Sequence, residues 1–243
     1  LSNRLPFVQK LRTGGYDGQG VKLIKTSHDL NSLFQEASLI EEMIPFEKEL
    51  SVIVARNKDG ETIAYQTVEC EFNEANLVEF LFSPADISQE IEKKAVDMAK
   101  SIINKFDMVG ILAVELFLTK NGDLLVNEVA PRPHNSGHHT IECNATSQFS
   151  QHLRSILNLP LGSTEIVRYG AMINLLGADD YVGKAIYKGL ENIMKTPSVY
   201  IHLYGKEITK PNRKMGHITV TSETISDAKR KAKSIKNNIK VIA

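Results

Sequence analysis

The 243-residue chain has 29 Lys and Arg residues against 29 Asp and Glu residues, so its formal net charge at pH 7 is zero. A neutral chain has no overall field that attracts nucleic acid or an anionic membrane, so local basic groups must be judged individually. Its length and its 42% hydrophobic content are sufficient for a sizeable core, in one long domain or in two.

Cysteine usage and apolar runs indicate the compartment. Cys70 and Cys143 are the two cysteines, without a C-x-x-C spacing, and no apolar run approaches the roughly 20 residues that span a bilayer. We therefore expect a reducing, cytoplasmic setting, with no membrane and no nucleic-acid partner. The chain begins at Leu1 without a signal-peptide pattern, which we interpret as the later part of a longer protein.

Two predicted strands, residues 6–11 and 21–24, flank a glycine-rich loop at 14–20. Its bare backbone N–H groups suit a phosphate chain, but the loop matches neither the P-loop nor the dinucleotide fingerprint. From the glycines alone, a flap over phosphates and an ordinary tight connection are equally good interpretations. Lys10, in the apolar strand before the loop, slightly favours phosphate.

A short helix and two strands are expected next. Ser27 can cap a helix through Ala37, and strands are predicted at 39–44 and 49–55. The first strand ends in apolar residues that could hold a flat base, although an ordinary edge strand explains it equally well.

The following segment is predicted to be scaffold. We expect a strand over 61–71, irregular structure over 72–82, and a helix that Pro84 opens and that keeps helical apolar spacing to Phe106.

A hairpin over residues 110–129 is the strongest local prediction. Asn121-Gly122 between two apolar runs is typical of a two-residue turn, because both turn positions need positive φ. With these two residues as the loop, Leu118 is expected to face Leu125.

The same register places Glu115 opposite Glu128 on one face of the sheet, with Cβ atoms about 5 Å apart. Two carboxylates that close repel each other and resist burial, so we expect a cation between them. Mg²⁺ is the strongest candidate, since it takes carboxylate oxygens and keeps positions for phosphate oxygens. A solvated face or a protonated carboxylate is the alternative, and the polar loop 130–140 favours a site.

The carboxyl-terminal pattern contains more strand than helix. In order, we expect a helix at 147–157, a strand at 167–176, a helical piece at 181–195, strands at 199–204 and 214–221, and a helix at 227–236. A change of composition near Ser163 predicts two domains, 1–162 and 163–243. A basic cluster, Lys206, Lys210, Arg213 and Lys214, is either a solvated turn or a site for a small anion, and the residues alone favour the solvated turn.

Six segments, in one order along nearly the whole chain, resemble the ATP-grasp ligases, and among them the branch that carboxylates an aminoimidazole ribonucleotide in purine biosynthesis. They are GGYDGQG (14–20), KELSV (48–52), NEVAPRPHNSGH (127–138), TSQF (146–149), HLYGK (202–206) and RKMGH (213–217). The resemblance implies a mixed α/β (α+β) ATP-grasp fold with a small, mostly-β carboxyl-terminal domain. It also implies that the amino-terminal domain and the first part of the grasp precede this sequence.

The resemblance further implies an ADP-forming carbon–nitrogen ligase, a homodimer that uses ATP and Mg²⁺. Bicarbonate would attack the γ-phosphate, and the resulting carboxyphosphate would carboxylate 5-aminoimidazole ribonucleotide. Another ATP-grasp ligase for a carboxylate or bicarbonate, and a non-catalytic nucleotide-binding fragment, are the alternatives. We expect this chain in isolation to bind nucleotide and metal weakly and to turn over nothing.

Site residues follow from the resemblance position by position. For ATP, it implies that Lys10 binds phosphate and that Gly14, Gly15 and Gly18 belong to a flap over the phosphates. Glu41, Glu42, Met43 and Ile44 would form the adenine hinge. Glu49 would bind the ribose, and Asn127 would lie beside the metal. The implied metal ligands are Glu115 and Glu128, the latter also counted with the ATP-binding residues. The ribonucleotide and the carboxylating species would be held by Tyr16, Asp17, His134, Asn135, Lys206 and Arg213, of which Asp17, Lys206 and Arg213 are expected to be catalytic.

Two positions depart from the family pattern. Gln19 stands where a basic residue is common, so a contact to substrate or phosphate is expected to be lost or supplied elsewhere. Phe72 stands where a histidine is expected, so the resemblance carries no nucleotide contact over to it.

Overall fold

The computed structural model describes residues 2–14, 20–73 and 77–243, which form strands and helices. The strands are β1 (Phe7–Leu11), β2 (Val21–Ile24), β3 (Ser38–Glu42), β4 (Phe46–Arg56), β5 (Thr62–Ala64), β6 (Val68–Phe72), β7 (Val78–Ser83), β8 (Gly110–Thr119), β9 (Leu124–Ala130), β10 (Tyr169–Leu176), β11 (Gly183–Lys184), β12 (Ile186–Lys188), β13 (Val199–Leu203), β14 (Ile208–Thr209), β15 (Lys214–Ser222) and β16 (Lys240–Ile242). The helices are α1 (Gln89–Lys105), α2 (Thr140–Cys143), α3 (Gln148–Ile156), α4 (Leu190–Ile193) and α5 (Ile225–Asn238), with 3-10 turns η1 (Ser2–Arg4), η2 (Ser27–Ser32) and η3 (Asn135–Gly137). Within these ranges, no helix has the length and apolar character needed to cross a membrane.

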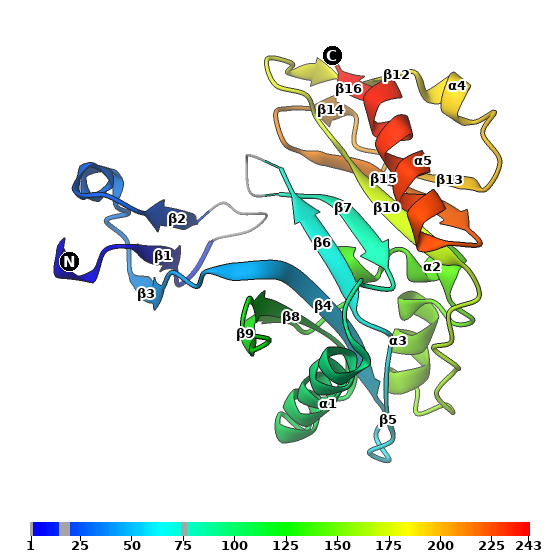
Figure 1. Ribbon diagram of the computed structural model, residues 1–243. Coiled ribbons are helices and arrows are strands. Elements are labelled where there is room, and N and C mark those ends of the chain that lie inside the picture. The colour runs from blue at the N-terminus through cyan, green and yellow to red at the C-terminus, as the bar shows by residue number, and fades with distance from the viewer. Residues whose placement is uncertain (1, 15–19, 74–76) are drawn as a thin grey trace.

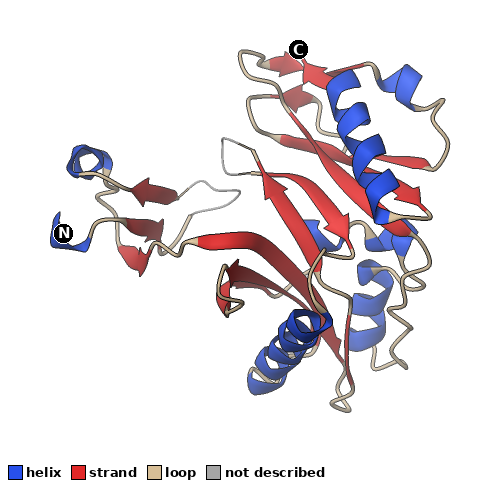
Figure 2. Cartoon of the chain, viewed as in Figure 1, coloured by secondary structure: helices blue, strands red, loops and turns tan. Residues whose placement is uncertain are grey.

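Two sheets contain most of the described strands, and β11-β14 and β12-β16 form two further two-stranded sheets. The larger has nine strands in the order β13-β15-β10-β7-β6-β4-β8-β9, with β5 paired to β4, and the smaller has the order β2-β1-β3. The small sheet stands apart from the main one and is joined to it where β3 runs into β4 (Figures 1 and 2). This mixed α/β architecture is the predicted one, and its carboxyl-terminal part is mostly strand, as expected.

Strands from both sides of Ser163 form the main sheet, because β10 pairs with β7. Helix α5 covers β10 and β15, and the apolar cluster beneath it includes Phe82, Ile173 and Val220 (Figure 1). The division of the chain into 1–162 and 163–243 stays a prediction.

Alternation along β4 and β8 separates the core from the site. Alternate residues of the two strands pack under α1, and they include Leu50, Val52, Val54, Val114, Leu116 and Leu118. Successive side chains on a strand point to opposite faces. The carboxylates between these apolar residues therefore lie on the face away from α1.

Several predicted boundaries were wrong. Helix α1 begins at Gln89 rather than at Pro84, because the Ser88 side chain caps it by accepting from Ile91 N. The helix expected at 27–37 is the 3-10 turn η2, which ends at Ser32, and Asp29 closes it by accepting from Thr26 N at 2.8 Å.

Other element types were also wrong. The single strand expected at 61–71 is two strands, β5 and β6, which pair with different parts of β4 on either side of buried Tyr65. The segment expected to be irregular contains β7, whose Phe80 and Phe82 pack against the core under α5. In place of a helical piece at 181–195 there are β11, β12 and the four-residue α4, since Gly189 takes a φ of 91° just before α4.

The central hairpin differs from its predicted register at one end. Thr119 N donates to Asp123 O at 2.9 Å and Gly122 N to Thr119 O at 3.0 Å, which makes the loop one residue longer than expected. Leu118 therefore faces Leu124, not Leu125. The register shifts again between Glu115 and Leu116, so Glu115 still faces Glu128 as predicted.

Candidate functional site

A cavity of about 280 Å³ lies between the small sheet and the main sheet. Nine residues predicted to bind nucleotide or metal line it: Lys10, Glu41, Glu42, Met43, Ile44, Glu49, Glu115, Asn127 and Glu128. The structure thus brings together segments that are up to 118 positions apart in the sequence, from β1 to β9.

Three carboxylates enter the cavity from three neighbouring strands. Glu49 lies on β4, Glu115 on β8 and Glu128 on β9, and Glu115 directly faces Glu128. Burial, followed by the charge of Glu128, raises the pKa of Glu49 to about 7, although Lys10 opposes this. Burial, then Glu128 and Glu49, likewise raises the pKa of Glu115 to about 7, against the opposing charges of Lys214 and Lys10. The positive charges near the cavity are therefore too few to stabilise the ionised forms of Glu49 and Glu115.

A β-bulge lets two consecutive residues of β9 line the cavity. The shift in pairing with β8 leaves Asn127 without an opposed residue, and such an extra residue bends the strand and redirects its side chains. Asn127 and Glu128 both line the cavity. Lys10 Nζ lies 3.0 Å from Asn127 Oδ1 and 2.7 Å from Glu41 Oε2, so this lysine connects the small sheet to the main sheet.

Most of the apolar lining of the cavity was missed by sequence reasoning. Besides the predicted Met43 and Ile44, it contains Val8, Val21, Leu23, Phe46 and Phe117, together with Phe72, to which no nucleotide contact was assigned. The rings of Phe46 and Phe117 stack with centroids 4.5 Å apart and planes 5° from parallel. Phe117 is two residues after Glu115 on the same strand, so the period of two could have identified it.

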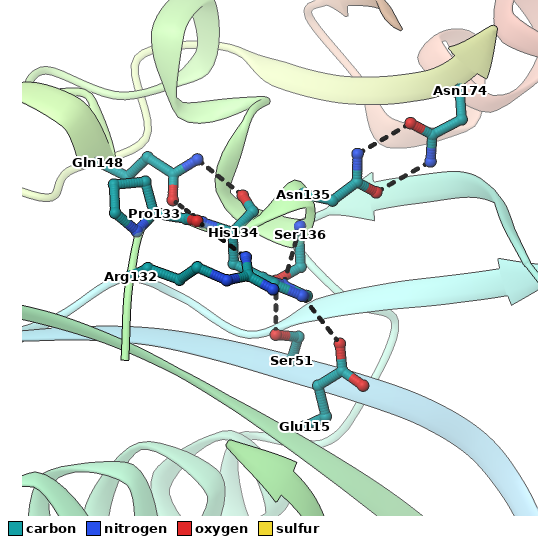
Figure 3. Close-up of polar contacts among 9 residues, drawn as sticks. All are labelled: Ser51, Glu115, Arg132, Pro133, His134, Asn135, Ser136, Gln148 and Asn174. Atoms are coloured by element: carbon teal, nitrogen blue, oxygen red, sulfur yellow. Dashed lines mark hydrogen bonds and ion pairs between the residues drawn. The ribbon is translucent and has the colours of Figure 1, made fainter. Parts of the chain in front are cut away.

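Gln148 clamps the loop that follows β9. Its side chain is fully buried, and its Oε1 accepts from His134 N at 2.9 Å while its Nε2 donates to His134 O at 2.8 Å (Figure 3). The same Nε2 lies 2.9 Å from His138 Nδ1. Because Oε1 must face the N–H donor, Nε2 is the donor to His138 Nδ1, and His138 then carries its proton on Nε2. Burial, with Lys214 and His202 nearby, lowers the pKa of His138 to about 4.

His134 links this loop to the carboxylates. Its Nδ1 lies 2.9 Å from Ser136 Oγ, which is 2.8 Å from Ser51 Oγ on β4 (Figure 3). Its Nε2 lies 3.7 Å from Glu115 Oε1. The loop is therefore held against the main sheet with an imidazole directed toward the carboxylates.

The basic cluster is close enough to these carboxylates for the charge of Lys214 to act on Glu115. Lys206 Nζ donates to Lys214 O at 2.6 Å and lies 5.7 Å from the ring centre of Tyr204. Lys214, which was predicted only as a member of the basic cluster, acts electrostatically on both Glu115 and His138 and so belongs with the site. Arg213 Nη1 donates to Ile208 O within its own turn at 2.8 Å.

The glycine-rich loop is described only at its two ends. Gly14 has a φ of 79°, and Leu11 N donates to Gly20 O at 2.8 Å, which closes the base of the loop. The predictions for Gly15, Tyr16, Asp17, Gly18 and Gln19 lie outside the described residues. Asn135 is held by Asn174, a residue that sequence reasoning did not single out.

Family models match both parts of the chain. The model of the ATP-grasp domain matches residues 2–149, and that of the phosphoribosylaminoimidazole carboxylase C-terminal domain matches residues 170–231. The chain is 44% identical, over 220 residues, to the N5-carboxyaminoimidazole ribonucleotide synthase of Bacillus subtilis strain 168. That alignment covers 89% of this chain and 56% of the relative.

Solved structures are similar over nearly the whole chain. The N5-carboxyaminoimidazole ribonucleotide synthetase of Thermotoga maritima has a TM-score of 0.89 at 44% identity, over 98% of this chain and 63% of that one. The N5-carboxyaminoimidazole synthase of Aspergillus clavatus, in complex with ADP and 5-aminoimidazole ribonucleotide, has a TM-score of 0.84 at 34% identity, over 96% of this chain and 61% of that one. The chain thus spans a little more than half the length of these three relatives. Since the ATP-grasp match covers more than half of its residues, the chain belongs to the ATP-grasp family.

Proposed function

We propose that this chain carries the nucleotide and metal site of an ATP-dependent carboxylase. The reaction consumes ATP, bicarbonate and 5-aminoimidazole ribonucleotide, and yields the carboxyamino ribonucleotide, ADP and phosphate. The observation that carries the proposal is the cavity in which Lys10, the 41–44 segment and three carboxylates meet. The names of the similar proteins, and the ADP and ribonucleotide in the Aspergillus clavatus complex, support the same reaction.

ATP fits the cavity in one direction. The end of β3, at Glu41 to Ile44, presents backbone groups beside an apolar lining, which suits adenine. Glu49 would accept from the ribose, and Lys10 would pair with phosphate oxygens. In this structure the Lys10 ammonium pairs with Glu41 and Asn127.

The donors present suit Mg²⁺. Among the described residues, no three His, Cys, Asp or Glu side chains form a preformed metal site. Mg²⁺ usually takes one or two protein carboxylates and fills its other positions with phosphate oxygens and water. Glu115 and Glu128 supply such a pair, and their mutual repulsion would be relieved by a cation. Mg²⁺ bound there would neutralise phosphate charge.

The ribonucleotide and bicarbonate would lie beyond the phosphates, between the 131–139 loop and the basic cluster. His134, Asn135, Lys206 and Arg213 would hold them, together with Tyr16 and Asp17. Positioning of reactants and neutralisation of phosphate charge are sufficient for phosphoryl and carboxyl transfer of this kind, without a covalent enzyme intermediate. We also propose a cytoplasmic homodimer, which sedimentation of the purified protein would test.

Release of ADP tests the reaction. We expect the complete protein to release ADP only when both bicarbonate and the ribonucleotide are present, and this chain, assayed beside it, to release none. Glu128→Gln should abolish nearly all turnover, whereas Glu191→Gln, at an exposed position on α4, should not change it. ADP release independent of the ribonucleotide would refute the substrate assignment. Full biological function with Glu128→Gln would indicate a non-catalytic role.

A further inference from the structure

A fully buried amide interrupts an apolar strand of the main sheet. Asn174 has no exposed surface, and it lies on β10 between β7 and β15, among Met172, Ile173 and Leu175. A polar group removed from water at such a position destabilises the fold unless it is hydrogen-bonded. The partners of this amide therefore indicate why an asparagine stands there.

Asn174 makes three hydrogen bonds. Its Nδ2 donates to Val78 O at 2.8 Å and to Asn135 Oδ1 at 2.9 Å, and its Oδ1 accepts from Asn135 Nδ2 at 2.8 Å. The two side-chain amides thus form a closed pair (Figure 3). Asn135 opens η3 in the loop that follows β9, 39 positions earlier in the sequence.

The orientation of both amides follows from one backbone carbonyl. Val78 O can only accept, so the Asn174 atom that faces it must be the nitrogen. This places Asn174 Oδ1 toward Asn135 and requires Asn135 to present its own nitrogen to that oxygen. Each carboxamide carries two N–H hydrogens and two oxygen lone pairs. The hydrogen bonds with Asn174 use one N–H and one lone pair of Asn135. The remaining N–H and lone pair of Asn135 are thereby given a defined direction.

We propose that Asn174 is a positioning residue for ribonucleotide recognition, which acts by holding the Asn135 carboxamide in the one orientation that the β7 backbone dictates. The inference rests on the proposed function, in which Asn135 contacts the ribonucleotide. It adds a residue of β10 to recognition, although Asn174 itself lies beneath the loop and contacts no substrate.

A double-mutant cycle on the complete protein tests this. The variants are Asn174→Ala, Asn135→Ala and the double variant, assayed for KM and kcat of the ribonucleotide at saturating ATP and bicarbonate. Asn174→Ala should raise the KM for the ribonucleotide roughly tenfold, the scale of losing one or two neutral hydrogen bonds, and should leave the KM for ATP unchanged. The double variant should be no worse than Asn135→Ala alone, because Asn174 acts through Asn135.

Asn144→Ala is the matched control. Asn144 is also a buried asparagine whose Nδ2 donates to a backbone carbonyl, Thr164 O at 2.9 Å, and its loss should leave the KM for the ribonucleotide unchanged. If Asn174→Ala does not fold, the similarly sized and uncharged Asn174→Leu replaces it. Leu fills the same space but cannot hydrogen-bond to Asn135 or Val78 O, and it should raise the same KM selectively.

The outcomes separate the two claims. Three results would overturn the role of Asn174 while the proposed function stands. They are additive effects of the two substitutions in the cycle, equal rises in the KM values for ATP and for the ribonucleotide, and no change in either KM. A wild-type protein whose ADP release ignores the ribonucleotide would overturn the proposed function, and this inference with it.

Discussion

Replacing Glu115 by Gln is expected to stabilise the ligand-free protein at pH 8. The substitution keeps the shape of the side chain but removes one of the three carboxylates, Glu49, Glu115 and Glu128, that enter the cavity from the main sheet. The Glu115 side chain is 18% exposed, so water screens this repulsion only weakly. Burial is the largest cause of the raised pKa, and it acts in the same direction as the neighbouring carboxylates.

The pKa values set the sign and the size of the effect. The pKa of Glu115 rises from an ordinary 4.5 to about 7 in the folded protein. Below 4.5 the group is protonated in both the folded and the unfolded state, so it does not affect stability. As pH rises from 4.5 through 7 the unfolded state releases the proton first, and the free energy of unfolding falls. Above pH 7 the full penalty for the ionised group applies, up to about 3 kcal/mol.

Urea unfolding at pH 5.5 and at pH 8, without divalent cations, measures this difference. Glu115→Gln should gain about 1–3 kcal/mol over wild type at pH 8 and clearly less at pH 5.5. The exposed Glu191→Gln serves as the control and should shift neither value. If Glu115→Gln were no more stable than wild type at pH 8, or differed from it equally at both pH values, the carboxylates would not repel as the geometry requires.

Three further substitutions test the site and its scaffold. Lys10→Met removes the ammonium that would meet the phosphates and should weaken ATP binding roughly 10- to 100-fold by calorimetry; unchanged affinity would exclude this lysine from the phosphate site. Gly137→Ala would place a Cβ 2.4 Å from Gln148 Oε1, so it should displace the clamp on His134 and lower stability by about 1–3 kcal/mol in urea. It should also impair turnover, and a fully active variant would show that the clamp is dispensable. Leu116→Ala, at a side chain 1% exposed under α1, should cost about 2–5 kcal/mol in the same assay without changing the site directly, and a loss below 1 kcal/mol would contradict the packing.

The paired glutamates were predictable from the sequence, but the reasoning behind them was only partly right. The Asn-Gly signal correctly located the hairpin, yet its loop is one residue longer than a two-residue turn. Taken alone, that difference would have shifted Glu115 away from Glu128. The bulge at Asn127 restores the pair, and local sequence signals do not reveal it. Lys10, which bonds Asn127 from another sheet, helps to hold the bulged strand and is distant in sequence.

Element types were predictable where a long periodic pattern dominates and not where packing decides. Helix α1 keeps an apolar stripe over its length, so its existence was predicted and only its start was wrong. The identity of β7 depends on Phe80 and Phe82 reaching the core under α5, which forms almost 150 residues later in the chain. A short segment with few local signals takes its structure from such partners.

The same limit applies more strongly to the site. Sequence reasoning found residues of kinds that can contact a ligand, such as His134 and Asn135, because polar side chains in a loop after a strand are conspicuous. The residues that hold them in place, Gln148 and Asn174, are amides within a helix and an apolar strand. Gln148 lies in the TSQF segment, but no role was predicted for it, and Asn174 was not singled out. Each becomes meaningful only when the fold brings it within 3 Å of the loop. Orientation of a carboxamide is set by what faces it, so a sequence indicates which groups are of a kind that binds ligands, while the groups that orient them have to be found in the structure.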